Sequence, residues 1–242
     1  MLKKVLFGAG TLAVALALAA PAQAAFQVTL SDGTSSLVIN DNTAPDLAAS
    51  SNVILWTGTI GSFVVSVDGQ TTNTPGGTIG FITTNVTING GTAGDTLTVM
   101  TSADNFTLPA GDPLILASSL SGTDAAIGPQ DVTFNSYANS PGVLNGLGNP
   151  TATQTCLGLT SGSISGQCAS AGTVTRSFSN GGSSYSLTDR ITIHLNTDLV
   201  GSLQVQGTTA AAVPEPGSMM LLGTGLFGLA RVARRRFSLG AR

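Results

Sequence analysis

The chain has 242 residues, enough for one large or two small domains, and its formal net charge at neutral pH is −3. Seven of the nine cationic residues lie at the two ends, whereas the stretch 25–213 holds two arginines against eleven aspartates, a formal charge of −9. Because this acidic, lysine-free stretch has no positive field to attract phosphates, nucleic acid is excluded as an expected partner.

The N-terminus predicts a cleavable secretory signal peptide over residues 1–24. Two lysines precede an apolar run, and a proline ends that run. Small residues follow in an A-x-A arrangement, supplied by Ala22 and Ala24, which is typical of a signal peptidase site. We expect cleavage after Ala24, so that Ala25 begins the mature protein outside the cytoplasm. A retained N-terminal anchor helix is the alternative.

The stretch 25–210 predicts one all-β domain, an antiparallel β-sandwich. It contains no Lys and no Glu, and it is rich in Thr, Ser, Gly, Asn and Val, which favours strands and turns over helices. Short segments of alternating polarity are separated by Gly or Pro, as in antiparallel sandwiches. In chain order, the expected strands cover residues 26–30, 36–40, 53–60, 63–67, 79–89, 96–101, 106–108, 114–120, 132–135, 173–178, 185–195 and 199–206.

Two features of this body carry further expectations. Its first two strands predict a β-hairpin, because Ser31-Asp32-Gly33 supplies turn residues between them. The stretch 124–172 is the least regular part, and we expect it to be a long excursion from the sandwich.

Thr, Ser and Asn must keep the surface of the body soluble, and such uncharged strands are weakly protected against edge pairing. That property suits a protein that associates in a matrix.

The two cysteines predict a disulfide. Cys156 and Cys168 are the only cysteines, and eleven residues separate them. In an exported chain, a single pair is most simply a disulfide, and a ring of this size stabilises by roughly 3 kcal/mol. A metal or redox site is the alternative, although zinc would need further ligands.

Candidate catalytic residues are sparse, so we predict no catalytic site and no cofactor. His194 is the only histidine, and the alternation around it predicts an exposed position on the polar face of a strand. The chain has no G-x-S-x-G elbow for a serine nucleophile. The body also lacks Glu, which the carboxylate pairs of glycosidases usually include. A secreted hydrolase that uses two aspartates is the least favoured alternative.

No metal site is predicted either, because the D-x-[DN]-x-D-G pattern of a calcium loop is absent from the chain. A calcium site built in space from four loop aspartates is the open alternative: Asp41, Asp46, Asp104 and Asp112.

The C-terminus combines an extended motif, an apolar segment and a basic cluster. The motif consists of Val213, Pro214, Glu215 and Pro216, and its prolines favour an extended backbone. The apolar run 218–230 would span about 20 Å as a helix, against about 30 Å of bilayer hydrocarbon, which makes it a marginal permanent anchor but an adequate temporary one. The cluster is expected to remain in the cytoplasm and contains Arg231, Arg234, Arg235 and Arg236.

Within that apolar run, residues 223–228 match the G-x-G-x-x-G pattern of dinucleotide-binding proteins. That fingerprint needs a preceding strand and a βαβ unit, and here a proline-rich motif and arginines flank it. We therefore expect the glycines to allow close packing or bending of a membrane helix.

This three-part C-terminus resembles the PEP-CTERM protein-sorting signal of Gram-negative bacteria, which is also labelled an ice-binding protein C-terminal domain. The resemblance covers residues 211–236 and leaves 237–242 as a cytoplasmic tail. It implies that an exosortase processes the tail, after signal peptidase has acted and while the membrane holds the precursor. It also implies a surface or secreted protein linked to biofilm, with exopolysaccharide as a candidate partner.

We therefore expect a non-enzymatic, exported protein of the cell surface or extracellular matrix. A carbohydrate- or ice-binding module that uses a flat face rich in Thr and Asn is the first alternative. Regularly spaced threonine pairs would favour it, and along the chain the threonine pairs are irregular.

Overall fold

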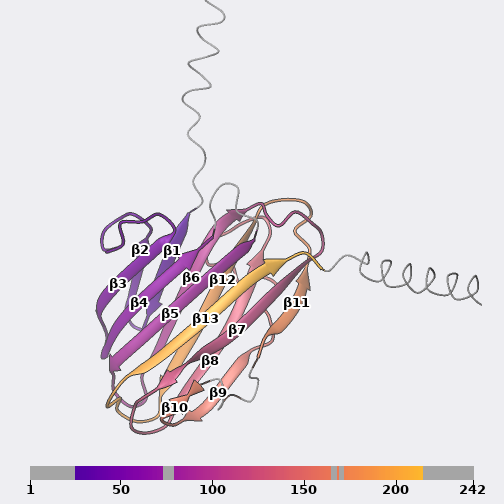
Figure 1. Ribbon diagram of the computed structural model, residues 1–242. Coiled ribbons are helices and arrows are strands. Elements are labelled where there is room, and N and C mark those ends of the chain that lie inside the picture. The colour runs from indigo at the N-terminus through magenta and orange to yellow at the C-terminus, as the bar shows by residue number, and fades with distance from the viewer. Residues whose placement is uncertain (1–24, 73–78, 165–167, 169–171, 215–242) are drawn as a thin grey trace, which may run out of the picture.

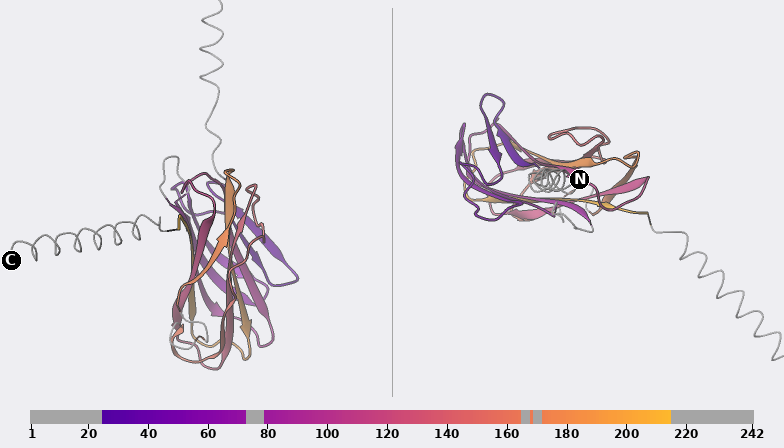
Figure 2. Two further views of the ribbon diagram at one scale, coloured as in Figure 1. Left: turned by 90° about the vertical axis from the view of Figure 1, so that its right-hand side faces the viewer. Right: turned by 90° about the horizontal axis from the view of Figure 1, so that it is seen from above.

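The computed structural model describes residues 25–72, 79–164, 168 and 172–214 (Figure 1). These residues form two antiparallel β-sheets without an α-helix, which confirms the all-β class. The two sheets face each other as the layers of a sandwich (Figure 2). Within the described ranges, no helix is long and apolar enough to cross a membrane. The expected signal helix and C-terminal helix fall on residues outside these ranges.

The first sheet has six strands in the order β2-β1-β6-β12-β8-β9. The bounds of its strands are β1 Phe26–Ser31, β2 Ser36–Asn40, β6 Thr96–Phe106, β8 Gln130–Asn139, β9 Gln154–Leu159 and β12 Tyr185–Leu195.

The second sheet has seven strands in the order β10-β7-β13-β5-β4-β3, with β11 also paired to β7. The bounds of these strands are β3 Val53–Ile60, β4 Phe63–Thr71, β5 Gly80–Gly90, β7 Leu114–Asp124, β10 Gly162–Ser163, β11 Val174–Phe178 and β13 Leu203–Ala212.

The hydrophobic core lies between the sheets because inward and outward residues alternate along most strands. In β12, Ile191, Ile193 and Leu195 are fully buried, while the residues between them are only partly covered. Each such buried side chain stabilises the fold by about 1.5–3 kcal/mol relative to an exposed one. A small residue is needed where a large side chain of one sheet packs against the other sheet. A Cβ on Gly207 of β13 would lie 2.5 Å from the Phe134 ring of β8, so a larger residue would not fit there.

The predicted hairpin is confirmed, since β1 and β2 pair antiparallel. Three other expectations differ from the structure. β6 runs without a break through both of the segments that were expected as separate strands, 96–101 and 106–108. The last strand covers Leu203–Ala212 instead of 199–206, because small residues continue to pair with both neighbours.

The expectation for 124–172 is the third, and it is wrong. This stretch contains β8, of which only 132–135 was expected as a strand and which pairs with β12 over ten residues inside the first sheet, and also β9 and β10. Inward side chains such as Val132 and Phe134 are fully buried, so the alternation of β8 decides its place despite the Gly- and Pro-rich flanks.

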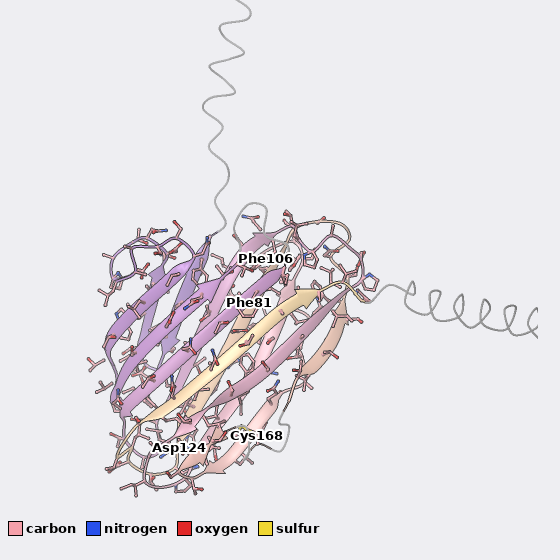
Figure 3. The ribbon with its side chains drawn as sticks, in the orientation of Figure 1. Phe81, Phe106, Asp124 and Cys168 are labelled. Carbon is pink, nitrogen blue, oxygen red and sulfur yellow. A yellow bond between two sulfur atoms is a disulfide. The ribbon has the colours of Figure 1, made fainter. Side chains whose placement is uncertain are left out.

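The disulfide prediction is confirmed by a Cys156–Cys168 bond with a Cα–Cα distance of 4.2 Å. Cys156 is fully buried on β9, and Cys168 packs against the core. Cys168 lies near the same end of the sandwich as Asp124, away from Phe106 (Figure 3). The bond therefore fastens the segment after β9 to the first sheet.

Replacing both cysteines by alanine is expected to lower the free energy of unfolding by about 3 kcal/mol, because the ring no longer restricts the unfolded chain. Urea unfolding of the Cys156→Ala/Cys168→Ala variant and of the oxidised wild type measures the effect. Reduced wild type is the control and should shift by a similar amount. Identical midpoints for oxidised wild type and variant would contradict a stabilising bond.

Candidate functional site

The strand that leads into the expected sorting motif is fully paired up to its last residue. Ala212 of β13 pairs with Ile115 of β7, and Val213 and Pro214 follow directly. Val213 is exposed and lies beside Gly111, in the loop between β6 and β7. No linker therefore separates the body from the motif. The rest of the motif, Glu215 and Pro216, lies outside the described residues.

The N-terminal end of the body lies at the same end of the sandwich (Figure 1). The Ala25 N–H donates a 2.7 Å hydrogen bond to Asp104 Oδ1, and the Asp104 N–H donates a 3.1 Å bond back to the Ala25 carbonyl. β6 then ends at Phe106, which stacks on Tyr185. A Cβ on Gly80 would lie 2.5 Å from the Tyr185 hydroxyl, and Gly80 pairs with Ala211 of β13.

This end of the body is called the terminal rim below, and it consists of Ala25, Val213, Pro214 and the loops 107–113, 140–149 and 179–184. It carries a shallow hollow whose lining mixes polar and apolar atoms and has no titratable side chain: Thr107, Ala110, Gly111, Asn180, Gly182, Ser183 and Ser184. The Tyr185 hydroxyl donates a 2.6 Å bond to the Leu108 carbonyl beneath it.

Residues 212–236 match the family model of the PEP-CTERM protein-sorting motif. The chain carries a PEP-CTERM sorting signal. The match begins at the last paired residue of β13, so the signal starts where the folded body stops. It implies an exosortase as processing partner, export across the inner membrane and sorting to the cell surface. Neither the curated proteins nor the solved structures contain a match to the chain.

Other residues that were expected to act in sorting fall outside the described ranges. These are Ala22 and Ala24 of the predicted cleavage site and the arginines Arg231, Arg234, Arg235 and Arg236. Of the predicted cleavage junction, only Ala25 is described.

A buried carboxyl links the two sheets, and the sequence analysis missed it. Asp189 of β12 is fully buried and points into the sandwich. The Thr84 hydroxyl of β5 donates a 3.2 Å bond to Asp189 Oδ2, and the Thr209 hydroxyl of β13 donates to Oδ1. Ser136 of β8 shares a hydrogen bond with Thr209. Thr101, directly across from Asp189 on β6, has a buried hydroxyl without a partner among the described residues.

A signal for this site was present in the sequence. In β12 the inward positions are Leu187, Asp189, Ile191 and Ile193, so an aspartate interrupts an apolar face at period two. A carboxyl at such a position must find hydrogen-bond partners or stay neutral.

Burial raises the pKa of Asp189 to about 7, and the hydrogen bonds from Thr209 and Thr84 only partly oppose the shift. An unfolded aspartate titrates near 3.8, so the folded protein binds a proton that the unfolded chain has released between these two pH values. The free energy of unfolding is therefore highest below about pH 4 on account of this group. It falls as pH rises to about 7, by on the order of 4 kcal/mol in total.

Asp189→Asn should remove most of this pH dependence, because an amide resembles the neutral acid and does not ionise. We expect the variant to be at least as stable as wild type at pH 8, and its unfolding free energy to fall much less than that of wild type between pH 4 and 7. Urea unfolding across that range measures both. Asp68→Asn, on the outer face of β4, is the matched control and should keep the wild-type slope. An unchanged slope in Asp189→Asn would contradict the assignment.

His194 lies on the polar face of β12 as predicted, although it is half-buried instead of exposed. Its Nδ1 lies 3.0 Å from the Thr96 hydroxyl of β6. Asp131 occupies the position across from His194 on β8, but its carboxylate accepts a 2.7 Å bond from the Gly158 N–H. These three side chains form a row on an open sheet face. A hydroxyl, an imidazole and a carboxylate are thus neighbours on this outer face.

The four loop aspartates do not meet. Asp41 and Asp46 lie in the loop between β2 and β3, where each accepts backbone N–H bonds, Asp41 from Asn52 and Asp46 from Leu55. Burial, together with the charge of Asp46, raises the pKa of Asp41. Asp104 lies on strand β6 instead of in a loop and accepts a bond from the Ala25 N–H, and Asp112 accepts a bond from Ser179. Within the described residues, no group of three or more His, Cys, Asp or Glu could hold a metal ion.

Proposed function

We propose that this protein is a non-enzymatic component of the cell surface or extracellular matrix, delivered as a precursor by its signal peptide and released by an exosortase. The observation that carries the proposal is the direct junction between a central strand of the body and the PEP-CTERM motif. Because its last strand is paired up to Ala212, the body is a complete folded unit that the sorting signal delivers. The sorting signal is a separate segment, and it can be removed without loss of any strand.

The junction also limits where processing takes place. The four residues that follow Ala212, up to Pro216, reach at most about 14 Å when fully extended. The terminal rim therefore rests close to the bilayer while residues 218–230 occupy it. Because Ala25 lies on the same rim, the signal peptide leaves from the same side, so the precursor is tethered through one end of the sandwich.

Mass spectrometry of the protein from cell-surface and culture fractions tests this proposal. We expect Ala25 as the first residue and a new C-terminus near Pro216. Glu215→Ala and Pro216→Ala should instead keep the intact C-terminus and accumulate in the membrane fraction, because the motif that the enzyme recognises is altered. Ser218→Ala lies within the matched signal but after the Val213–Pro216 segment, so it is the control and should be processed normally. Recovery of mature wild-type protein ending at Arg242 would contradict the proposal.

A second candidate function, carbohydrate binding, is favoured by the outer face of the first sheet. The strand registers place one hydroxyl residue of each strand in a single row across all six strands: Ser36, Ser31, Thr98, Thr192, Thr133 and Thr155. At about 4.8 Å between strands, this hydroxyl row extends roughly 24 Å. The row is absent from the sequence pattern, because it depends on register between distant strands.

The chemistry of the hydroxyl row suits a neutral, polyhydroxylated chain better than a planar crystal surface. Its six members carry no charge, and a hydroxyl can both donate and accept hydrogen bonds. The Ser31 hydroxyl already does both within its hairpin, donating to the Ser35 carbonyl and accepting from the Gly33 N–H. Strands in a sheet rotate by about 20–25° relative to their neighbours, so the row follows a twist that a flexible polysaccharide can match. The loop 140–149 covers the sheet nearer the terminal rim, where the Asn145 N–H binds the Ser102 hydroxyl at 2.9 Å, and leaves the row outside it.

Thr98→Val/Thr192→Val/Thr133→Val removes three central hydroxyls at nearly constant shape. If the row binds polysaccharide, retention on exopolysaccharide from the producing cells or on cellulose should fall by about tenfold or more, given about 0.5–1.5 kcal/mol per hydrogen bond. The matched control changes three hydroxyls on the outer face of the second sheet, Thr87→Val/Thr208→Val/Thr123→Val. Equal retention of both triple variants would reject the row as a binding face.

A further inference from the structure

The N-terminal residue of the body is placed against a carboxylate before any cleavage has occurred. In the uncleaved chain, the Ala25 nitrogen is a peptide N–H that donates to Asp104 Oδ1 at 2.7 Å. The Asp104 N–H returns a 3.1 Å bond to the Ala25 carbonyl. Asn105 Nδ2 also donates to the same carboxylate oxygen, at 3.1 Å. The carboxylate is therefore held beside the position where signal peptidase is expected to leave a new terminus.

We propose that removal of the signal peptide creates an ion pair between the new α-ammonium group of Ala25 and the carboxylate of Asp104, and that this pair fastens β1 to β6. The inference rests on the proposed cleavage after Ala24. Hydrolysis of that peptide bond turns a neutral N–H into a cation with three donors at the same nitrogen. A hydrogen bond between ionised partners is roughly twice as strong as a neutral one.

The position of this pair gives it a structural role. The hairpin of β1 and β2 joins the rest of the first sheet only through β6. β1 contributes Phe26, Val28 and Leu30 to the core, and Phe26 is its first residue. The ion pair closes the open end of β1, at the point where a terminal strand frays most easily. Signal cleavage thus removes the covalent link between β1 and the signal peptide and creates an ion pair between β1 and β6.

The charged groups around this terminus are acidic. Asp104 comes from β6, and Asp41 comes from the loop after β2, where its backbone N–H donates to the Phe26 carbonyl. The loop 140–149, which packs near Asn105, has no titratable side chain. An α-ammonium ordinarily loses its proton near pH 7.7, and an acidic partner delays that loss. While the carboxylate is ionised, the stabilisation is therefore present below about pH 7.7, and it disappears as pH rises through the higher pKa of the ammonium group in the folded state.

The test uses the exported mature protein and two changes at the terminus. Ala25→Gln gives an N-terminal glutamine that cyclises to a neutral lactam, which keeps one N–H but has no charge. Ala25→Ser keeps the ammonium group and is the matched control. Each is combined with Asp104→Asn, and mass spectrometry establishes the first residue and the cyclisation. Urea unfolding from pH 6.5 to 10 and hydrogen exchange of the β1 amides are the readouts.

In the wild-type and Ala25→Ser backgrounds, Asp104→Asn should raise the unfolding equilibrium constant up to about fivefold at pH 6.5, the range of exposed ion pairs, and the effect should fade by pH 10. In the lactam background the effect should be smaller and independent of pH. Hydrogen exchange of the β1 amides should likewise be accelerated more by Asp104→Asn in the wild-type and Ala25→Ser backgrounds than in the lactam background. Equal effects of Asp104→Asn in all backgrounds, with Ala25 as the first residue of the wild type, would overturn the ion pair alone. A different first residue would overturn it together with the predicted cleavage site, while the sorting motif would stand.

Discussion

The placement of β13 between β5 and β7 is the constraint on which the rest of the structure depends. β13 is the last strand of the described body, yet it lies inside the second sheet. The strands on either side of it join only through its hydrogen bonds. The second sheet is therefore complete only when residues 203–212 are in place. Because the sorting signal begins at residue 212, one segment both closes the fold and presents the signal at the terminal rim.

The polar contacts between the sheets complement the apolar core. Hydrophobic burial has no direction, so apolar contact alone does little to set the position of one sheet along the other. The hydrogen bonds from Thr84 and Thr209 to Asp189 are directional and cross the interface from two strands of the second sheet. Hydroxyl groups can donate to a carboxylate and can also accept from a protonated acid. They therefore satisfy Asp189 in either protonation state, which an arginine partner would not do.

The parts of the structure that depend on composition or near neighbours were predictable from the sequence. These include the all-β class, the first hairpin and the disulfide. Only the middle of β8, residues 132–135, was predicted as a strand; its full length and its place in the sheet were not, because Gly- and Pro-rich flanks surround its alternation and its partner β12 is distant in the chain. The inward position of Asp189 follows from the period of β12, but its partners come from β5 and β13, and no local pattern reveals them. The hydroxyl row likewise depends on five registers at once.

The scarcity of charge also determines how the sheet edges are protected. β3 is an eight-residue edge strand without a charged side chain, which is the kind that attracts another strand. The preceding loop covers part of this edge: Asp46 accepts the Leu55 N–H, and the Leu47 N–H donates to the Leu55 carbonyl. At the other edge, β7 pairs with two short strands, β10 and β11, instead of one long one. Backbone hydrogen bonds from a loop and short edge strands thus limit edge-to-edge pairing here, a role that lysines have in other sheets. A body without Lys or Glu can therefore keep broad faces of hydroxyl and amide groups for neutral partners, while its edges are partly closed to its own copies.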